Sequence, residues 1–239
     1  MQRAEDVSRG GAAPFRTGGT VFNRDENPDW YSALADQVGK ASMNAGPAGA
    51  WKSLLKNWTA TGKVKAAFID AKGLRYPQAT ANFKASTSEL DRYPEPLQIA
   101  FRQLAVEAAI EAGDAVFARE QLLAYEKIDT RYRDPTTQQL LAGRLAESQG
   151  LFTDAYNAYS LAMQSRDRRV EAEARYGKAS AGYADGKLTP EDARAEFETL
   201  SAIWRRSEVE VKSLEKLGEF YATEGRWREA FLAAQRATQ

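Results

Sequence analysis

The chain has 239 residues, its 33 Lys and Arg residues are balanced by 33 Asp and Glu residues, and it contains neither cysteine nor histidine. The balanced charge provides no overall field that would draw the molecule onto nucleic acid or an anionic membrane. Without cysteine and histidine the chain cannot form disulfides, thiolate nucleophiles, imidazole metal ligands or a Ser-His-Asp triad. We therefore expect a protein without catalytic residues, metal or cofactor.

Hydropathy and the N-terminus bear on localisation. No run approaches the roughly 18 apolar residues of a membrane span, and the sequence before residue 20 has no apolar signal-peptide core. We expect a soluble protein without membrane insertion, cytoplasmic by default, or periplasmic if the chain is the processed part of a longer envelope protein.

Residues 1–27 are rich in Gly, Arg, Asp and Asn, and their substantial apolar side chains are Phe15, Val21 and Phe22. So few apolar atoms do not offset the entropy of ordering a chain. This composition predicts a flexible N-terminal arm. Because Phe15 and Phe22 are apolar groups in a polar tail, we expect them to contact a partner.

Residues 28–96 form a less regular helical segment. The predicted helices carry apolar stripes, which are Trp30, Leu34 and Val38, then Trp51, Leu54, Leu55 and Trp58, then Phe83, Thr87 and Leu90. Between the last two stripes, residues 62–77 predict a helix followed by a loop, because Gly73 and Pro77 are helix breakers. The third stripe should end before Pro94 and Pro96. The helices from 50 to 92 can be interpreted as a degenerate first repeat.

Glycines recur along the second half of the chain. Gly113, Gly150, Gly186 and Gly225 are separated by 37, 36 and 39 residues, and alanine follows three of them five residues later, at Ala118, Ala155 and Ala230. Self-similarity at this period is typical of stacked helical hairpins. Glycine at each tight turn supplies the left-handed backbone that ends the first helix, and the alanine allows close helix packing.

The predicted helices flank these glycines in pairs. Their expected ranges are 97–111 and 115–126, 136–148 and 153–164, and 211–223 and 227–236, with a more divergent pair in 170–200. In that pair Thr189 is expected to cap the second helix and Pro190 to occupy its first position. The turn before Thr189 is longer than the others, which indicates a lengthened loop.

These residues resemble the tetratricopeptide repeat (TPR) family over about residues 97–239. The last unit keeps Leu217, Gly218, Tyr221, Gly225, Trp227 and Ala230 at the family's usual offsets, and an earlier unit keeps Gly143, Gly150, Ala155, Tyr159 and Ala162. The resemblance implies an all-α, right-handed α-solenoid of helix-turn-helix repeats. It also implies a bacterial-type scaffold, adaptor or assembly factor that binds a polypeptide in its concave groove.

Transferring the family's groove positions onto this chain gives a mixed, somewhat acidic surface. The residues assigned to it are Leu140, Arg144, Glu147, Lys212, Glu215 and Glu219, with Thr137, Ser148, Thr223, Gln103, Glu107, Ile110 and Glu111 as further members. The set lacks the Lys and Arg cluster that would clamp a C-terminal carboxylate. Ordinary solvated surface is the simpler interpretation of each residue taken alone.

An arginine-rich edge offers an alternative function, the binding of nucleic acid or another acidic ligand. It would comprise Arg92, Arg131, Arg133, Arg166, Arg168, Arg169, Arg205 and Arg206, with Trp204 as an aromatic platform. We favour the simpler explanation that cations at helix C-termini complement the helix dipole. Likewise, Trp204 fits a core position, and the acidic group Glu191, Asp192, Glu196 and Glu198 fits the start of a helix better than a metal site. An enzyme or sensor that uses residues 62–77 is the least favoured alternative.

The last predicted helix carries Trp227, Phe231 and Leu232. Some of these side chains should pack inward against Leu214, Leu217 and Tyr221, and the remainder should form an exposed apolar patch. We therefore predict that Phe231 and Leu232 contact a partner or a second copy of the chain, or that the chain is cut from a longer protein whose next helix would cover them.

Overall fold

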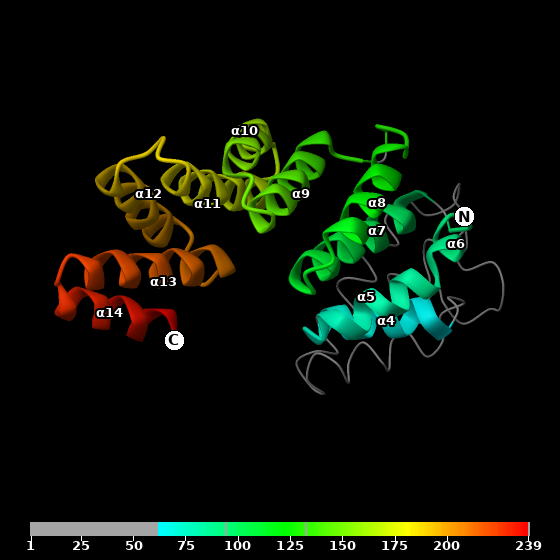
Figure 1. Cartoon of the computed structure of the whole chain (residues 1–239), viewed down its shortest axis with the longest axis horizontal. Helices are drawn as coiled ribbons and strands as arrows, with labels where there is room; N and C mark the ends of the chain where they lie inside the picture. The colour runs from blue at the N-terminus through cyan, green and yellow to red at the C-terminus, as the bar shows by residue number, and fades with distance from the viewer. Residues whose placement is uncertain (1–61, 94, 132, 239) are drawn as a thin grey trace, which may run out of the picture. The chain divides into compact units, whose positions relative to one another are not determined.

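In a computed structural model of the chain, residues 62–93, 95–131 and 133–238 are described. These residues form α-helices joined by short turns and contain no β-strand (Figure 1), so the expected all-α class is confirmed for this part of the chain. The chain divides into an N-terminal unit, residues 1–132, and a C-terminal unit, residues 133–239. Phe15, Phe22 and the two stripes between residues 30 and 58 lie outside the described residues.

The N-terminal unit contains helices that pack on one another around an apolar core. They are α4 (Gly62–Lys72), α5 (Tyr76–Ala85), α6 (Thr87–Leu90), α7 (Glu95–Glu111) and α8 (Ala115–Glu126). Helix α7 contacts α4, α5, α6 and α8. Its Phe101 is fully buried, with the ring of Phe68 at 6.0 Å and that of Tyr93 at 5.4 Å, both edge-on. Because Phe68 of α4 and Tyr93 of the preceding turn both pack on Phe101, α7 is central to the unit.

Two expectations for residues 62–90 are wrong in detail. The loop after α4 spans only residues 73–75, and α5 begins at Tyr76 with Pro77 in its first turn. Proline is tolerated there because the first turn leaves its N–H groups unpaired in any case. The single helix expected through Phe83 and Leu90 is divided at Ser86, whose hydroxyl bonds the Asn82 carbonyl oxygen at 2.7 Å.

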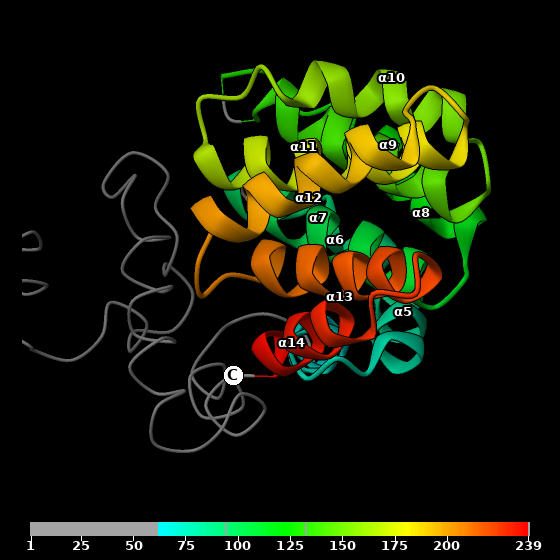
Figure 2. The same cartoon turned by 90° about the vertical axis from the view of Figure 1, so that its left-hand side faces the viewer.

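The C-terminal unit consists of helices in consecutive pairs. They are α9 (Pro135–Ser148), α10 (Phe152–Ala162), α11 (Arg168–Ala184), α12 (Pro190–Ile203), α13 (Glu208–Thr223) and α14 (Trp227–Ala237). Each helix packs on the next along the chain, and α11 also contacts α9 and α13. Helices α13 and α14 lie side by side in both views (Figures 1 and 2). The observed bounds differ from the expected ranges by at most three residues.

Polar caps define where several of these helices begin. The Asp134 carboxylate accepts a hydrogen bond from the Thr136 N–H at 3.0 Å, and Asp167 accepts one from the Arg169 N–H at 2.8 Å. As expected, Thr189 caps α12 by accepting from the Asp192 N–H at 3.1 Å. These bonds satisfy N–H groups that have no partner within the helix.

The four repeating glycines all have the left-handed backbone that was predicted. Their φ angles are +75° at Gly113, +73° at Gly150, +71° at Gly186 and +75° at Gly225. An L-residue with a Cβ adopts this conformation at a cost. The turns therefore depend on glycine for backbone reasons, since a Cβ at any of the four would meet no atom within 4 Å.

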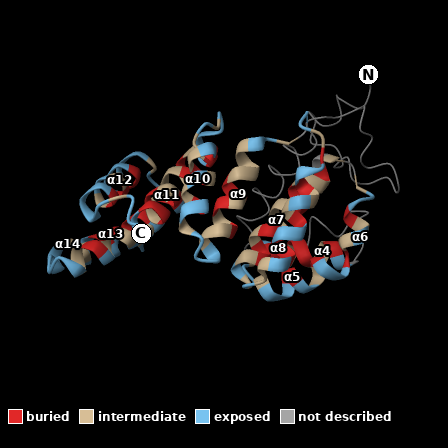
Figure 3. Cartoon of the chain, turned by 45° about the horizontal axis from the view of Figure 1, so that its top comes forward, coloured by how far each residue is buried: buried red, intermediate tan, exposed pale blue. Residues whose placement is uncertain are grey.

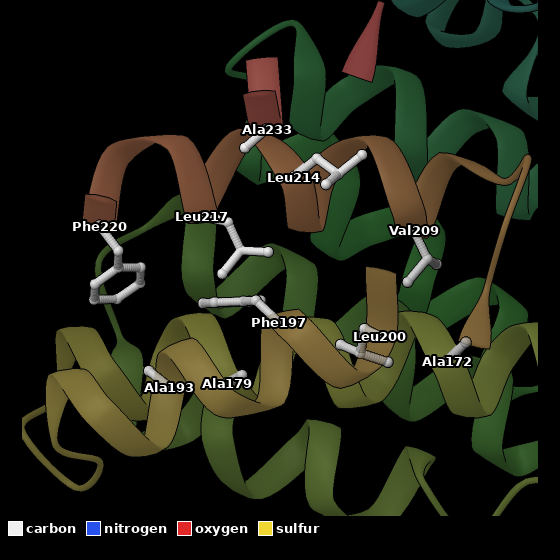
Figure 4. Packing of buried hydrophobic residues seen from close by; sticks show 10 residues of the cluster. All are labelled: Ala172, Ala179, Ala193, Phe197, Leu200, Val209, Leu214, Leu217, Phe220 and Ala233. Carbon is white, nitrogen blue, oxygen red and sulfur yellow. The ribbon is translucent and has the colours of Figure 1, made fainter. Parts of the chain in front are cut away.

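Buried residues lie between the helices of each unit (Figure 3). The largest cluster of the C-terminal unit is formed by α11, α12, α13 and α14 and includes Phe197, Leu200, Leu214, Leu217 and Phe220 (Figure 4). The rings of Phe197 and Phe220 are 6.0 Å apart. A second cluster around Tyr159 joins α9, α10 and α11.

Tyr159 explains two glycines that lie within helices. A Cβ on Gly143 of α9 would be 2.7 Å from the Tyr159 ring, and one on Gly177 of α11 would be 2.4 Å from it. The ring is 1% exposed and therefore has no free space into which to move. The two glycines allow α9 and α11 to pack against opposite sides of one buried tyrosine.

Candidate partner-binding surfaces

Five groove residues were predicted on α9, and one of them lies in the core. Leu140 is only 5% exposed and belongs to the cluster around Tyr159. It cannot contact a partner without leaving that cluster, so its assignment to a binding surface is wrong. Repeat offsets alone did not indicate which positions of α9 would be covered by α10 and α11.

Two other predicted residues, Arg144 and Glu147, hold α9 against α10 and α11. Arg144 is paired with Glu173 of α11. The Glu147 carboxylate accepts hydrogen bonds from the Tyr159 hydroxyl at 2.6 Å and from the Ser180 hydroxyl at 2.8 Å. Both side chains are half-buried. Their polar groups are therefore used within the unit, which leaves little for recognition of a peptide.

The same network perturbs the titration of the tyrosine. Burial of Tyr159, followed by the nearby negative charge of Glu147, raises the pKa of its hydroxyl far above the ordinary value of 10.0. Deprotonation would place a second negative charge beside the carboxylate in a region with little water. Tyr159 is thus a structural hydrogen-bond donor at neutral pH.

On α13, by contrast, all four predicted groove residues, including Thr223, are exposed. Lys212, Glu215 and Glu219 share one side of the helix at helical spacing. Glu219 pairs with Lys216 at 2.7 Å. Lys212 and Glu215 line a surface hollow that lies at the start of α13 and the end of α14.

The hollow brings together residues that the sequence analysis assigned to the groove and residues that it assigned to the arginine-rich edge. Its charged lining consists of Arg205, Arg206, Glu208, Glu210, Lys212, Glu215 and Arg236. Glu210 is already used, because it pairs with Arg236 at 3.1 Å and accepts from the Arg206 backbone N–H at 2.6 Å. Within the described ranges, the side chains of Arg205, Arg206 and Lys212 form no ion pair. They are the cations of the hollow that remain available to an acidic ligand.

A capping signal could have predicted this hollow. Ser207 caps α13 by accepting from the Glu210 N–H at 3.3 Å, and Ser-x-x-Glu is a common start of a helix. The expected start at Val211 overlooked this pattern. Starting the helix at Glu208 would have placed Arg205 and Arg206 in the preceding turn, near Lys212.

Four further arginines of the proposed edge have local partners. The Arg131 side chain bonds Asp129 at 2.9 Å, Arg133 bonds Gln138 at 2.5 Å and Arg169 bonds Glu173 at 3.0 Å. The guanidinium of Arg168 lies 5.3 Å from the ring centre of Trp204. These contacts favour the local explanation of the arginines over a continuous binding edge.

Trp204 and the acidic group at α12 also have structural roles. Trp204 ends α12 and packs, half-buried, against the large cluster. Asp192 belongs to the cap of α12, Glu196 pairs with Arg175 at 2.6 Å and Glu198 accepts from the Tyr221 hydroxyl at 2.9 Å. Among the described residues no group of three or more acidic side chains is arranged to hold a metal ion.

The most exposed apolar surface in the C-terminal unit lies on α14. Trp227 is 70% exposed, Phe231 69% and Leu232 48%. The expectation that some of these side chains pack into the core is wrong. Helix α14 packs on α13 through its small residues instead, with Ala233 buried and Ala237 packed against the cluster. We call the surface formed by Trp227, Phe231, Leu232 and Ala234 the outer face of α14; α14 is largely exposed in Figure 3.

The described part of the chain contains no helix with the length and hydropathy needed to span a bilayer. None of the protein-family models, curated proteins or solved structures with which the sequence was compared matches it.

Proposed function

We propose that this chain is a non-enzymatic scaffold or adaptor that binds another polypeptide, and that its C-terminal unit is a right-handed array of TPR-like hairpins. The recurrence of a left-handed glycine between paired helices supports the array, as does the contact of α11 with both α9 and α13. The single observation that carries the binding function is the outer face of α14. Its Trp227 and Phe231 are each about 70% exposed.

The physical argument is the concentration of large apolar side chains on one surface. Isolated exposed apolar residues are common, but adjacent ones expose a contiguous apolar area to water, and this favours association. Tryptophan in particular is enriched among residues that dominate binding energy at protein interfaces. Arg228 lies beside this surface and has no ion pair among the described residues. A polypeptide partner would cover the rings and leave the charge at the rim.

Site-specific photo-crosslinking tests this proposal. The full chain would carry p-benzoylphenylalanine at position 231 in one variant and at position 161 in the other. Leu161 on α10 is 50% exposed and provides the matched control. We expect one defined polypeptide to be crosslinked at position 231, and Trp227→Glu to abolish that product. Equal products at the two positions, or a product insensitive to Trp227→Glu, would contradict the proposal.

The hollow between α13 and α14 supports a second candidate function, the binding of an acidic ligand. Arg205, Arg206 and Lys212 are its available cations, while Glu208 and Glu215 partly cancel them. A short acidic peptide and a single-stranded oligonucleotide would be titrated in turn against the full chain and its Arg205→Ala variant. Binding that weakens steeply with added salt and requires Arg205 would support this candidate.

A further inference from the structure

The even-numbered helices of the C-terminal unit can be aligned on one small residue each. These residues are Ala155 in α10, Ala193 in α12 and Ala230 in α14. The first two are fully buried and the third is half-buried. Each is the fourth residue of its helix. Positions counted from this alanine can therefore be compared among the three helices.

In α10, the positions one and four residues after the alanine contact the next odd-numbered helix. Tyr156 lies against Gly182 of α11, where a Cβ would be 3.0 Å from its ring. Tyr159 lies against Gly177 of the same helix. Large rings of α10 are thus received by glycines of α11.

In α12, the same two positions contact α13. Arg194 bonds the Glu224 carboxylate at 2.5 Å, and the Phe197 ring lies 6.0 Å from that of Phe220. The outer face of an even-numbered helix is therefore an interface twice within this unit. In both cases the interface is formed with the odd-numbered helix that follows in the chain.

In α14, the corresponding residues are Phe231 and Ala234, and both are exposed. No described helix of the C-terminal unit follows α14 to cover them. The outer face of α14 hence continues a series of two internal interfaces. What occupies it can be deduced from what occupies the other two.

Charge provides the second criterion. Helices α11 and α13 each end in a carboxylate that bonds the preceding even-numbered helix. Asp185 at the end of α11 accepts from the Thr153 hydroxyl at 2.9 Å, and Glu224 at the end of α13 pairs with Arg194. Thr153 lies two residues before its reference alanine, and the same position in α14 is Arg228. In α12 the contact with Glu224 is made instead by Arg194, one residue after the alanine. A carboxylate at the end of a helix that docks as α11 does on α10 would therefore face Arg228.

Resting on the function proposed above, we propose that the outer face of α14 binds an amphipathic helix of another polypeptide. The docked helix packs as α11 packs on α10. It places glycine or alanine against Phe231 and an acidic residue at its C-terminal end against Arg228. A second copy of α14 is a poorer occupant, because its outer face has no free carboxylate to place opposite Arg228. The nearest carboxylate, that of Glu229, is paired with Arg226 at 3.2 Å.

A peptide taken from the chain itself provides the probe. Residues 168–186 comprise α11 and its terminal Asp185, and in the folded chain they present Gly177 and Gly182 to α10. The fluorescein-labelled peptide and its Asp185→Lys counterpart would be titrated by anisotropy against the full chain. Sedimentation velocity would be run in parallel on the chain without peptide.

The chain variants are Phe231→Glu, Arg228→Glu and the control Leu161→Glu. We expect Phe231→Glu to weaken binding of the peptide at least tenfold, since a central ring is lost, and Leu161→Glu to leave it unchanged. The Asp185→Lys peptide should bind the wild-type chain about threefold more weakly. Arg228→Glu should reverse this preference between the two peptides. A surface that binds apolar groups nonspecifically would not show such a dependence on charge.

Three outcomes would overturn the proposal. They are an absence of binding by the wild-type chain, equal binding by the Phe231→Glu and Leu161→Glu chains, and a self-association that Phe231→Glu abolishes. The last would make a second copy the occupant. If crosslinking at position 231 still captures a different polypeptide, the proposed scaffold function stands while the helical partner with its acidic end does not.

Discussion

Helices α10 and α14 each follow a left-handed glycine turn, but the outer face of α10 is covered by α11 and that of α14 is exposed. In α10, Tyr156 occupies the position that corresponds to Phe231, and it is half-buried with its ring against Gly182 of α11. In α14, Phe231 stands 69% exposed. The difference shows that a large ring on an even-numbered helix needs small residues on the next helix. Where α11 provides them the ring stabilises the fold, and where no described helix does the ring is available for binding.

The largest effect should come from filling the space beside Tyr159. Gly177→Val would place its Cβ 2.4 Å from the ring, and overpacking a rigid core costs about 3 kcal/mol or somewhat more. Urea unfolding would measure the loss. Gly218→Ala is the matched control, because its Cβ would meet nothing closer than 3.8 Å. That variant should be neutral or gain up to about 1 kcal/mol from helix propensity. Equal effects would contradict the packing argument.

The shared turn should matter next. Gly150→Val introduces a β-branched residue at a φ of +73°, and we expect the free energy of unfolding to fall by about 1 to 3 kcal/mol. Because no atom lies within 4 Å of the added Cβ, the cost is one of backbone conformation alone. Gly150→Asn should recover much of the loss, since asparagine tolerates this region. An unchanged melting temperature for the valine variant would refute the turn assignment.

A smaller effect is expected from the tyrosine hydroxyl. Tyr159→Phe removes a hydrogen bond to a carboxylate and should cost about 1 to 2 kcal/mol near neutral pH. The pKa of Tyr159 is raised in the fold by burial and by Glu147. The associated stability is therefore present below the unfolded-state pKa of about 10 and is lost as the pH rises above it.

Unfolding measured between pH 8 and pH 11 would check this sign. The wild type should lose stability above pH 10 more steeply than Tyr159→Phe. Part of the slope should remain in the variant, because burial also raises the pKa of Tyr176. A parallel decline of both proteins would show that Tyr159 is not the group responsible.

The smallest effect on stability should come from α14. Phe231→Glu and Leu232→Lys change side chains that are already exposed, so we expect each to alter the free energy of unfolding by less than about 0.5 kcal/mol. The same pair of substitutions should reduce binding of an apolar dye by the chain. A loss of more than about 2 kcal/mol would mean that the outer face belongs to the core, and the contrast with α10 would disappear.

Local features of the fold were predictable because they depend on residues close together in the chain. The left-handed turns followed from glycine at a fixed period, and the start of α12 followed from Thr189 and Pro190. Helix α13 was placed three residues short only because the Ser207 cap was overlooked. The misinterpretation of Pro77 had a similar origin, since proline ends one helix but is accommodated in the first turn of another.

The surfaces were less predictable, because burial depends on which helix lies opposite. Leu140 and Glu215 occupy comparable positions in a repeat, but one is in the core and the other lines a hollow. The sequence by itself determined the helical class, the turns and most helix bounds, through local backbone and capping energetics. Only the tertiary structure decided that Gly143 and Gly177 enclose Tyr159, and that small residues seat α14 while its aromatic rings face outward. These outcomes depend on the contact of side chains more than ten residues apart, which no local pattern specifies.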